Sequence, residues 1–429
     1  MTGRQHDQQA MGQQAREQQA LGAALDTLPA RIAGAGDTVA ATTTRRDFLA
    51  RHAIGLYDRL TAGRSRFLRV GELLLAAADA APGLVPDRQA LAAEAARPLS
   101  AKTGIEMAQA EFLAAIFADR GAGLHLCHAM MLPRPEAPEN AARLARDGVL
   151  DLGLVRIMRQ GRLLIVENRN TGRLNAEDVP TIDALEHAVD AALLDADSAA
   201  CILRGGVVDH PRYAGRRLAG AGLNLTDLYE GRVPYVMYIE REMGWVSKVF
   251  RGLASPGELP DETAQTVEKA WIGVIDTFAI GAAAQALLVC DAVVAEAGSW
   301  FNVPARKEGL VPGATNLRLP RIMGDRLARQ IIMTGRTIQA DSPEGRLLVD
   351  RVAPAGELDA AIAEVAADLV DGGVVSVAGN RRAFRVGQEP LDLFRAYLAT
   401  YTREVAICHL SPALVANLER HWTGRRKAG

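Results

Sequence analysis

The sequence predicts an α/β protein in which a core of stacked β–β–α turns lies between two helical regions. Apolar residues recur at helical spacing in the first third of the chain and again after Pro354. Between these regions, β-rich runs alternate with helical runs, which is typical of a doubly wound sheet. The 429 residues are enough for one sizeable core with a helical addition.

Four regions are expected along the chain. Residues 1–44 are polar and rich in glutamine and small residues, which favours a frayed helix or a disordered arm. Residues 45–150 are expected to form a helical N-terminal domain, because positions such as Phe48, Leu56 and Ile116 follow the helical period. Residues 151–353 are expected to form the α/β core, and residues 354–429 a C-terminal helical region.

The period of the apolar residues changes after the prolines near position 135, where the core begins. Two β-rich runs flank Gln160-Gly161 and predict a hairpin. Helical runs and short apolar runs then alternate twice, as they do in strand, helix, strand units. The expected elements are strands over 152–159, 162–168, 199–203, 271–279 and 292–295, with helices over 179–194 and 282–289.

The bulk properties exclude several classes of protein. With 49 basic and 51 acidic residues, the formal net charge is -2, so the chain has no overall attraction for nucleic acid or an anionic membrane. Its four dispersed cysteines and the lack of an apolar run of roughly 18 to 20 residues favour a soluble, cytoplasmic protein. His125 and His128 are metal-ligand types without a distant partner, so we expect helix packing and no metal site.

Two glycine-containing segments are the strongest candidates for a site. They are Ala219-Gly-Ala-Gly-Leu-Asn-Leu-Thr-Asp-Leu228 and Phe278-Ala-Ile-Gly-Ala-Ala-Ala-Gln285. Small residues let backbone N–H groups approach a ligand, and the second segment opens a helix whose positive end favours a developing oxyanion. Taken singly, each turn is more often a plain packing site.

Taken together, the order and spacing of the two segments resemble the enoyl-CoA hydratase/isomerase (crotonase) superfamily. The resemblance continues through residues 301–316 and 319–321 and covers roughly 152–352. It implies a crotonase-like spiral of ββα turns with an oxyanion hole for a CoA thioester. The implied donors are the amides of Ala282 and of Leu223 or its neighbour Ala221, each contributing about 2.7–4 kcal/mol to the transition state. The implied neighbours of the bound thioester are Gly222, Asn224, Gly281 and Ala283.

Hydratases of this superfamily carry two glutamates where this chain has Gln285 and Ala305. An amide and a methyl group cannot exchange the protons that water addition needs, so hydration is not expected. The Gly281-Ala-Ala-Ala turn also departs from the usual glycine triplet. Its extra methyl groups are expected to alter fit or rate, while an alanine N–H still donates.

A narrower resemblance covers nearly the whole chain and rests on residues 175–178, 207–216, 301–309 and 316–321. These motifs are similar to a branch of the superfamily that oxidises an arylacetyl-CoA with O2 and uses no metal, flavin or haem. The resemblance implies conversion of a dihydroxyphenylacetyl-CoA to the arylglyoxylate and free CoA through a thioester enolate. It also implies a place in dihydroxyphenylglycine supply for glycopeptide antibiotics.

The same resemblance implies roles for further side chains. Glu177 and Arg241 would contact the bound acyl-CoA, with Gln285 near the reacting carbon. Ala305 and Leu310 would line an apolar O2 pocket. Two alternatives stay open: Glu177 also suits a helix N-terminus, and Arg241 a solvated surface.

An insertion before the first glycine segment carries His210, Pro211, Arg212 and Tyr213. With Arg216 and Arg217 these residues could form a cationic patch for CoA phosphates, and the alternative for the two arginines is a solvated loop face. The resemblance further implies a homotrimer or a dimer of trimers. Its C-terminal helices would supply contacts and cover either their own active site or a neighbour's. Two other functions stay open: a CoA thioesterase or isomerase that acts without oxygen, and a non-catalytic acyl-CoA-binding subunit.

Overall fold

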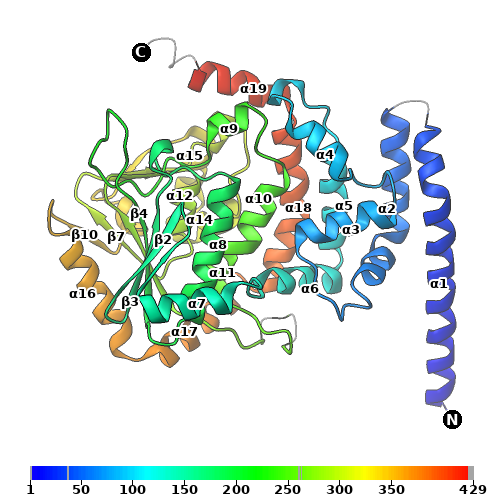
Figure 1. Ribbon diagram of the computed structural model, residues 1–429, viewed down its shortest axis with the longest axis horizontal. Helices are drawn as coiled ribbons and strands as arrows, with labels where there is room; N and C mark the ends of the chain where they lie inside the picture. Colours follow the sequence, from blue (N-terminus) through cyan, green and yellow to red (C-terminus); the bar gives the residue numbers. More distant parts are fainter. Residues whose placement is uncertain (1, 36–37, 259–260, 262, 424–429) are drawn as a thin grey trace.

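The computed structural model describes residues 2–35, 38–258, 261 and 263–423, and its centre is a seven-stranded sheet (Figure 1). The strand order is β1-β2-β3-β4-β5-β7-β10. The first three strands pair antiparallel and the rest pair parallel. The strands are β1 (Val149–Asp151), β2 (Val155–Gln160), β3 (Leu163–Asn168), β4 (Ala200–Gly205), β5 (Ala270–Ile275), β7 (Ala292–Glu296) and β10 (Arg351–Ala353).

Helices cover both faces of this sheet, which explains why its parallel strands read as continuous apolar runs. Every residue of β5 is buried. Helix α8 (Val179–Leu194) packs against β2 and β3, and α12 (Ala282–Leu287) packs against β5. Helix α16 (Leu358–Asp371) covers β4, β5, β7 and β10. The expected helix over 179–194 has these bounds in the structure.

A second sheet of three strands carries one of the two glycine segments. It consists of β6 (Phe278–Ile280), β8 (Trp300–Asn302) and β9 (Ile338–Gln339). The single strand expected over 271–279 is therefore wrong, because β5 and β6 belong to different sheets. The strand is interrupted at Asp276, whose carboxylate accepts hydrogen bonds from the Arg204 guanidinium on β4.

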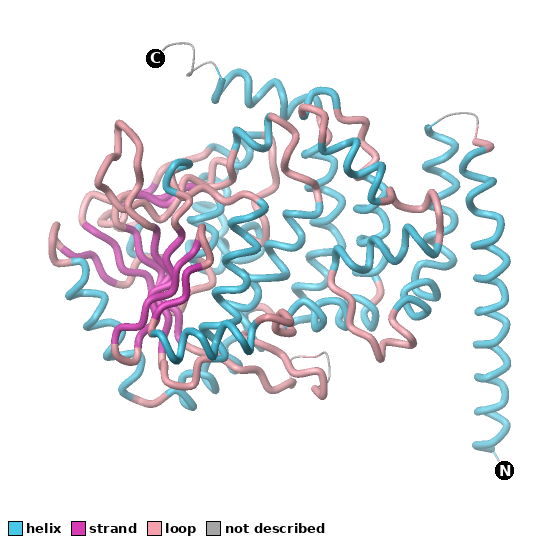
Figure 2. Tube along the Cα trace, viewed as in Figure 1, coloured by secondary structure: helices cyan, strands magenta, loops and turns pink. Residues whose placement is uncertain are grey.

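The N-terminal part is helical from the first described residues. Helix α1 (Thr2–Ala33) lies beside α2 (Thr38–Leu60), as Figures 1 and 2 show. Leu21, Leu25 and Leu28 of α1 are buried. Most of the polar arm expected over residues 1–44 is thus helix, while residues 1, 36 and 37 lie outside the described part.

The remaining helices fall into three groups along the chain. The N-terminal group is α3 (Val70–Ala80), α4 (Arg88–Ala95), α5 (Met107–Ala118), α6 (Arg120–Met131) and α7 (Ala137–Asp147). The central group is α9 (Leu225–Tyr229), α10 (Val236–Arg241), α11 (Ser247–Arg251), α13 (Ala305–Glu308), α14 (Thr315–Met323) and α15 (Asp325–Thr334). The last group is α17 (Val374–Gln388), α18 (Leu391–His409) and α19 (Pro412–Leu418).

Helix α18 packs between the N-terminal helices and the α/β core. It packs against α5 and α6, and Figure 1 shows it between the N-terminal helices and the helices that cover the sheet. One hydrophobic cluster contains Phe112 of α5, Leu185 of α8, Ile239 of α10 and Leu398 of α18. The helical additions therefore share a hydrophobic core with the α/β part. None of the described helices has the length and apolar character needed to cross a membrane.

Candidate active site

The two glycine segments lie side by side although about 60 residues of sequence separate them. Gly220 and Ala279 form a parallel bridge, and the Ile280 N–H donates to the Gly220 carbonyl at 3.0 Å. A Cβ on Gly222, whose φ is +88°, would lie 3.2 Å from the Ile280 carbonyl oxygen. Gly281 has φ +53° and ψ −116°, which only glycine adopts without strain. Glycine is thus needed where the segments touch.

Two backbone amides at this junction are left without a protein acceptor. In the described part of the chain, the N–H groups of Leu223 and Ala282 make no hydrogen bond, and both residues line one cavity. Ala282 is the first residue of α12, where helical N–H groups have no partner inside the helix. The Ala221 N–H instead donates to the Leu174 carbonyl at 3.0 Å, so the alternative of Ala221 as a donor is wrong.

The cavity beside these amides has a volume of about 60 Å³. Nine residues selected from the sequence line it: Glu177, Gly222, Leu223, Arg241, Gly281, Ala282, Gln285, Ala305 and Leu310. The sequence reasoning missed Met237, Tyr238, Glu242, Glu308, Val311, Pro312, Gly313 and Tyr401. Tyr401 belongs to α18, so this C-terminal helix covers the cavity of its own chain.

Arg241 is the centre of the polar wall of the cavity. Its guanidinium is buried and donates to both carboxylate oxygens of Glu177, with the Nη2 to Oε1 distance at 3.1 Å. It also donates to Glu242 at 2.6 Å, to the Gln285 side-chain oxygen at 3.2 Å and to the Ala282 carbonyl at 2.8 Å. The interpretation of Arg241 as a solvated surface charge is therefore wrong.

A loop held by asparagines fixes the position of Glu177. Asn175, in the left-handed region at φ +55°, donates to the carbonyls of Gly206 and Leu218 at 2.8 and 2.9 Å. The Glu177 backbone bridges to the first glycine segment, with its N–H 2.7 Å from the Gly222 carbonyl. Asp178 caps α8 by accepting from the Thr181 N–H, which leaves the neighbouring Glu177 carboxylate for Arg241.

A π-helical turn begins directly after Arg241. Residues Glu242–Val246 form this turn between α10 and α11. Such turns insert an extra residue into a helix and are frequent at functional sites. Gly244 in the turn lies so close to Glu186 that a Cβ there would come within 2.9 Å of its carboxylate. Arg241, the last residue of α10, and Glu242, the first residue of the turn, both line the cavity.

Buried ion pairs continue from the cavity into the C-terminal part of the chain. Glu242 accepts from Arg318 at 3.3 Å, and Arg318 pairs with Glu389 at 3.0 Å. Glu389 also pairs with Arg251 at 3.0 Å. We call this series, which starts at Glu177 and Arg241, the ion chain. All six side chains in it are buried.

The opposite wall of the cavity is mostly apolar. Ala305 opens the short helix α13, and Leu310 follows the left-handed Gly309 that ends it. Glu308 is partly buried on the same helix, and its carboxylate has no hydrogen-bond or ion-pair partner in the described part of the chain. Burial raises the pKa of Glu308 to about 7.

The alanine turn leaves the cavity open to a ligand. Of its three alanines, only Ala282 lines the cavity. Ala284 is buried in a separate hydrophobic cluster. A Cβ on Gly220 would come within 3.1 Å of the Ala283 methyl, which therefore faces the first glycine segment. The methyl groups of Ala283 and Ala284 are accommodated by packing outside the cavity.

Several other residues selected from the sequence lie outside the cavity. Asn224 caps α9, where its side chain accepts from the Asp227 N–H. His210, Arg212 and Tyr213 stack in the loop before the first glycine segment, with the Arg212 guanidinium 5.4 Å from the Tyr213 ring centre. That loop lies beside β6, because the Tyr213 ring packs edge-on against Phe278.

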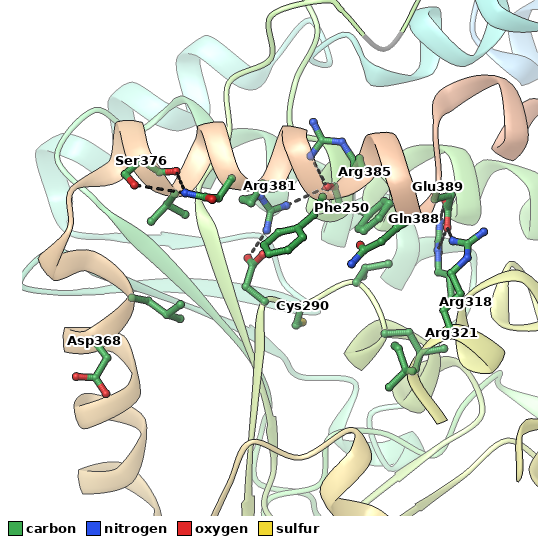
Figure 3. Close-up of a pocket in the computed structure, with 18 of the residues that line it drawn as sticks. Phe250, Cys290, Arg318, Arg321, Asp368, Ser376, Arg381, Arg385, Gln388 and Glu389 are labelled. Carbon is green, nitrogen blue, oxygen red and sulfur yellow. Dashed lines mark hydrogen bonds and ion pairs between the residues drawn. The ribbon is translucent and has the colours of Figure 1, made fainter. Parts of the chain in front are cut away.

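A larger hollow of about 590 Å³ shares no residue with the amide cavity (Figure 3). It lies between α14, α16, α17 and the end of α12. Its arginines are committed to carboxylates: Arg381 and Arg385 pair with Glu268, and Arg318 pairs with Glu389. The smaller cavity combines unpaired amides with an unpaired carboxylate and is the better candidate for chemistry.

His125 and His128 have packing partners on α6. Tyr57 hydrogen-bonds to His125 Nδ1 at 2.6 Å, and the Phe67 ring stacks on the same imidazole. His128 Nε2 lies 3.0 Å from the Ser255 carbonyl. No group of three or more histidine, cysteine, aspartate or glutamate side chains in the described ranges is arranged to hold a metal ion.

A mostly parallel sheet wound with β–β–α turns, with two unpaired amides from separate turns beside one cavity, defines a crotonase-type enzyme. The chain belongs to the enoyl-CoA hydratase/isomerase (crotonase) family, whose sequence profile matches residues 259–397. It is 44% identical over 364 residues to the (3,5-dihydroxyphenyl)acetyl-CoA 1,2-dioxygenase of Amycolatopsis orientalis. These aligned residues are 85% of this chain and 82% of that protein.

More distant relatives match a smaller share of the chain. The short-chain-enoyl-CoA hydratase of Clostridium acetobutylicum is 26% identical over 243 residues, which are 56% of this chain and 84% of that protein. An enoyl-CoA hydratase structure from Mycobacterium avium subsp. paratuberculosis superposes with a TM-score of 0.52 at 20% identity, covering 64% of this chain and 97% of that one. An enoyl-CoA hydratase structure from Bacillus halodurans superposes with a TM-score of 0.51 at 18% identity, covering 62% of this chain and 100% of that one. The predicted fold class and family resemblance are confirmed.

Proposed function

We propose that the protein is a cofactor-independent dioxygenase that converts (3,5-dihydroxyphenyl)acetyl-CoA and O2 to (3,5-dihydroxyphenyl)glyoxylate and CoA. The observation that carries this proposal is the 44% identity over 85% of the chain to an enzyme named for dioxygenation of that thioester. The pair of unoccupied amides supports it, because an enolate oxygen needs such donors. A role in supplying dihydroxyphenylglycine for glycopeptide antibiotics belongs to the same proposal.

The proposed reaction begins with a thioester enolate. The thioester oxygen binds between the N–H groups of Leu223 and Ala282, and loss of an α-proton places negative charge on that oxygen. The electron-rich α-carbon then reduces O2 and forms a carbon-bound peroxide. The peroxide attacks the thioester carbonyl and expels the CoA thiolate. Cleavage of the O–O bond, with loss of the second α-proton, gives the arylglyoxylate.

We assign Glu177 and Arg241 to substrate contact, with the Glu177 carboxylate accepting from a ring hydroxyl. Gln285 ends the second glycine segment and accepts a hydrogen bond from Arg241, which suits a position near the reacting carbon. The apolar wall formed by Ala305 and Leu310 is the proposed place for O2. His210, Arg212 and Tyr213 are assigned to the CoA phosphates, outside the cavity.

A homotrimer or dimer of trimers is also part of the proposal. Helix α17 leaves apolar side chains in solvent, with Val375 83% exposed and Phe384 63% exposed. Exposed apolar residues clustered on one helix favour contact with another subunit. Light scattering after gel filtration would measure the mass, and a monomer would contradict this assignment. The free cysteines support a reducing, cytoplasmic location.

The decisive experiment measures O2 uptake and CoA release together. Chelator-treated protein should consume one O2 for each CoA released from (3,5-dihydroxyphenyl)acetyl-CoA and should form the arylglyoxylate. Equal CoA release without O2 would instead identify a thioesterase, and a double-bond shift without O2 an isomerase. Tight binding of the CoA ester without any turnover would identify a non-catalytic binding subunit.

A further inference from the structure

The amide cavity is lined by three carboxylates that differ in their partners. Glu177 is held by both ends of the Arg241 guanidinium, and Glu242 is shared by Arg241 and Arg318. Glu308 lines the same cavity and has no such partner among the residues that the structure describes. Two of the carboxylates thus have their charge balanced by arginines, and the third does not.

The backbone holds Glu308 in a defined place. Ala305 and Glu308 are three residues apart on α13, so they lie on the same side of the helix, and both line the cavity. Gly309 ends the helix in the left-handed conformation, and its N–H donates to the Ala305 carbonyl at 2.8 Å. A Cβ on Gly309 would come within 3.3 Å of the Leu414 Cα, so α19 supports the turn.

We propose that Glu308 is the catalytic base that removes the α-proton of the bound thioester. The inference rests on the proposed function and deepens it. The α C–H bond breaks, the proton passes to a Glu308 oxygen, and the electron pair forms the enolate whose oxygen binds the Leu223 and Ala282 amides. Protonated Glu308 then gives its proton to the departing CoA thiolate. The restored carboxylate takes the second α-proton as the O–O bond breaks and the keto group forms.

The other groups around Glu308 do not titrate in the same range. Tyr238 and Tyr401 line the cavity from α10 and α18, and burial raises the pKa of both phenols well above the usual value. Tyr238 hydrogen-bonds to His409 at 3.2 Å, and burial lowers the pKa of that imidazole to about 3. Arg241 stays charged because its carboxylate partners raise its pKa.

The helices that pack on α13 add no other group near Glu308. Helix α15 carries Asp325, Arg326 and Arg329, all exposed, and α19 carries no charged residue. Arg306 and Lys307 on α13 itself are also exposed. Glu177 and Glu242 remain in their ion pairs. Burial also raises the pKa of Glu240 on α10 to about 7, but Glu240 does not line the cavity. A rate that depends on a cavity group titrating near pH 7 is therefore assigned to Glu308.

The test separates proton removal from oxygen chemistry. Wild-type protein is mixed with the substrate in D2O without oxygen, and mass spectrometry follows deuterium entering the α-carbon. The same measurement is made on Glu308→Gln, Glu308→Asp and the control Glu364→Gln, whose carboxylate is exposed on α16. O2 uptake, affinity for the CoA ester and thermal unfolding are measured for each protein.

We expect Glu308→Gln to lose exchange and kcat by about 10²- to 10⁴-fold while it stays folded and binds the ester. Glu308→Asp should recover part of the rate, and Glu364→Gln should match wild type. Wild-type exchange should rise with pH to a plateau above about pH 7, whereas the residual rate of Glu308→Gln should not.

Several results would overturn this assignment. Exchange by Glu308→Gln at the wild-type rate would show that another group removes the proton. A raised KM with an unchanged kcat would make Glu308 a binding residue. Wild-type exchange without O2 uptake would refute the dioxygenase and leave Glu308 as the base of another enolate reaction. A wild-type protein with neither activity would refute the proposed function and the base with it.

Discussion

Replacing Arg241 with methionine should destabilise the protein far more than replacing any exposed arginine. Methionine keeps much of the apolar contact with Trp245, whose ring lies 5.1 Å from the Arg241 guanidinium, but removes the charge. Glu177 then has no cationic partner among the described residues, while Glu242 keeps Arg318. An uncompensated buried charge costs about 3–5 kcal/mol, so the free energy of unfolding should fall by that amount.

Urea unfolding followed by tryptophan fluorescence measures this loss, and a double-mutant cycle assigns it. In the Arg241→Met protein, Glu177→Gln should restore stability, because it removes the stranded charge. The coupling between the two positions should be roughly 1–3 kcal/mol. Arg329→Met, at an exposed pair, should change stability by no more than about 0.5 kcal/mol. If Arg241→Met costs no more than Arg329→Met, or if the two positions are additive, the ion chain does not stabilise the cavity.

Four further outcomes are expected. Gly281→Ala should lower kcat by about 10²-fold or more, because a Cβ at φ +53° displaces the Ala282 amide; unchanged kcat would refute this need for glycine. Ala305→Leu should raise the KM for O2 measured with an oxygen electrode, and a change confined to the KM for the CoA ester would contradict the oxygen pocket. Gln285→Glu should not gain hydration of an enoyl-CoA, read as loss of ultraviolet absorbance, because Ala305 still supplies no partner acid. Burial raises the pKa of Glu308 from 4.5 to about 7, so the ionised side chain destabilises the folded state increasingly as the pH rises from 4.5 to 7. In urea unfolding, Glu308→Gln should therefore add up to roughly 3 kcal/mol of stability at pH 8 and nothing at pH 4. An equal gain at both pH values would show that the ionised carboxylate does not destabilise the fold.

The sequence predicts those parts of the fold that depend on local pattern. The apolar period over 179–194 specifies α8, and the glycines at 222 and 281 mark the two turns, because their positive φ values exclude other residues. The helix of the first 33 residues was also open to sequence reasoning. Leu21, Leu25 and Leu28 repeat at helical spacing and are buried.

Other features depend on contacts between distant residues and left no local signal. At the break between β5 and β6, Asp276 pairs with Arg204, which lies 72 residues earlier. Tyr401 lines the cavity because α18 returns to the core, which no short-range pattern indicates. Glu308 had a weak signal, since it lies one helical turn after Ala305. Recognising that signal required knowing that residues 305–308 form a helix.

The ion chain constrains how this cavity can change during evolution. Its members alternate in sign from Glu177 to Arg251, so the six charges sum to zero. A single neutral substitution leaves one buried charge in excess, whereas removal of two adjacent members restores the balance. We therefore expect positions 177, 241, 242, 318, 389 and 251 to vary as complementary pairs among relatives. Glu177 on the cavity wall is thus tied, through its arginine, to charged residues that do not line the cavity.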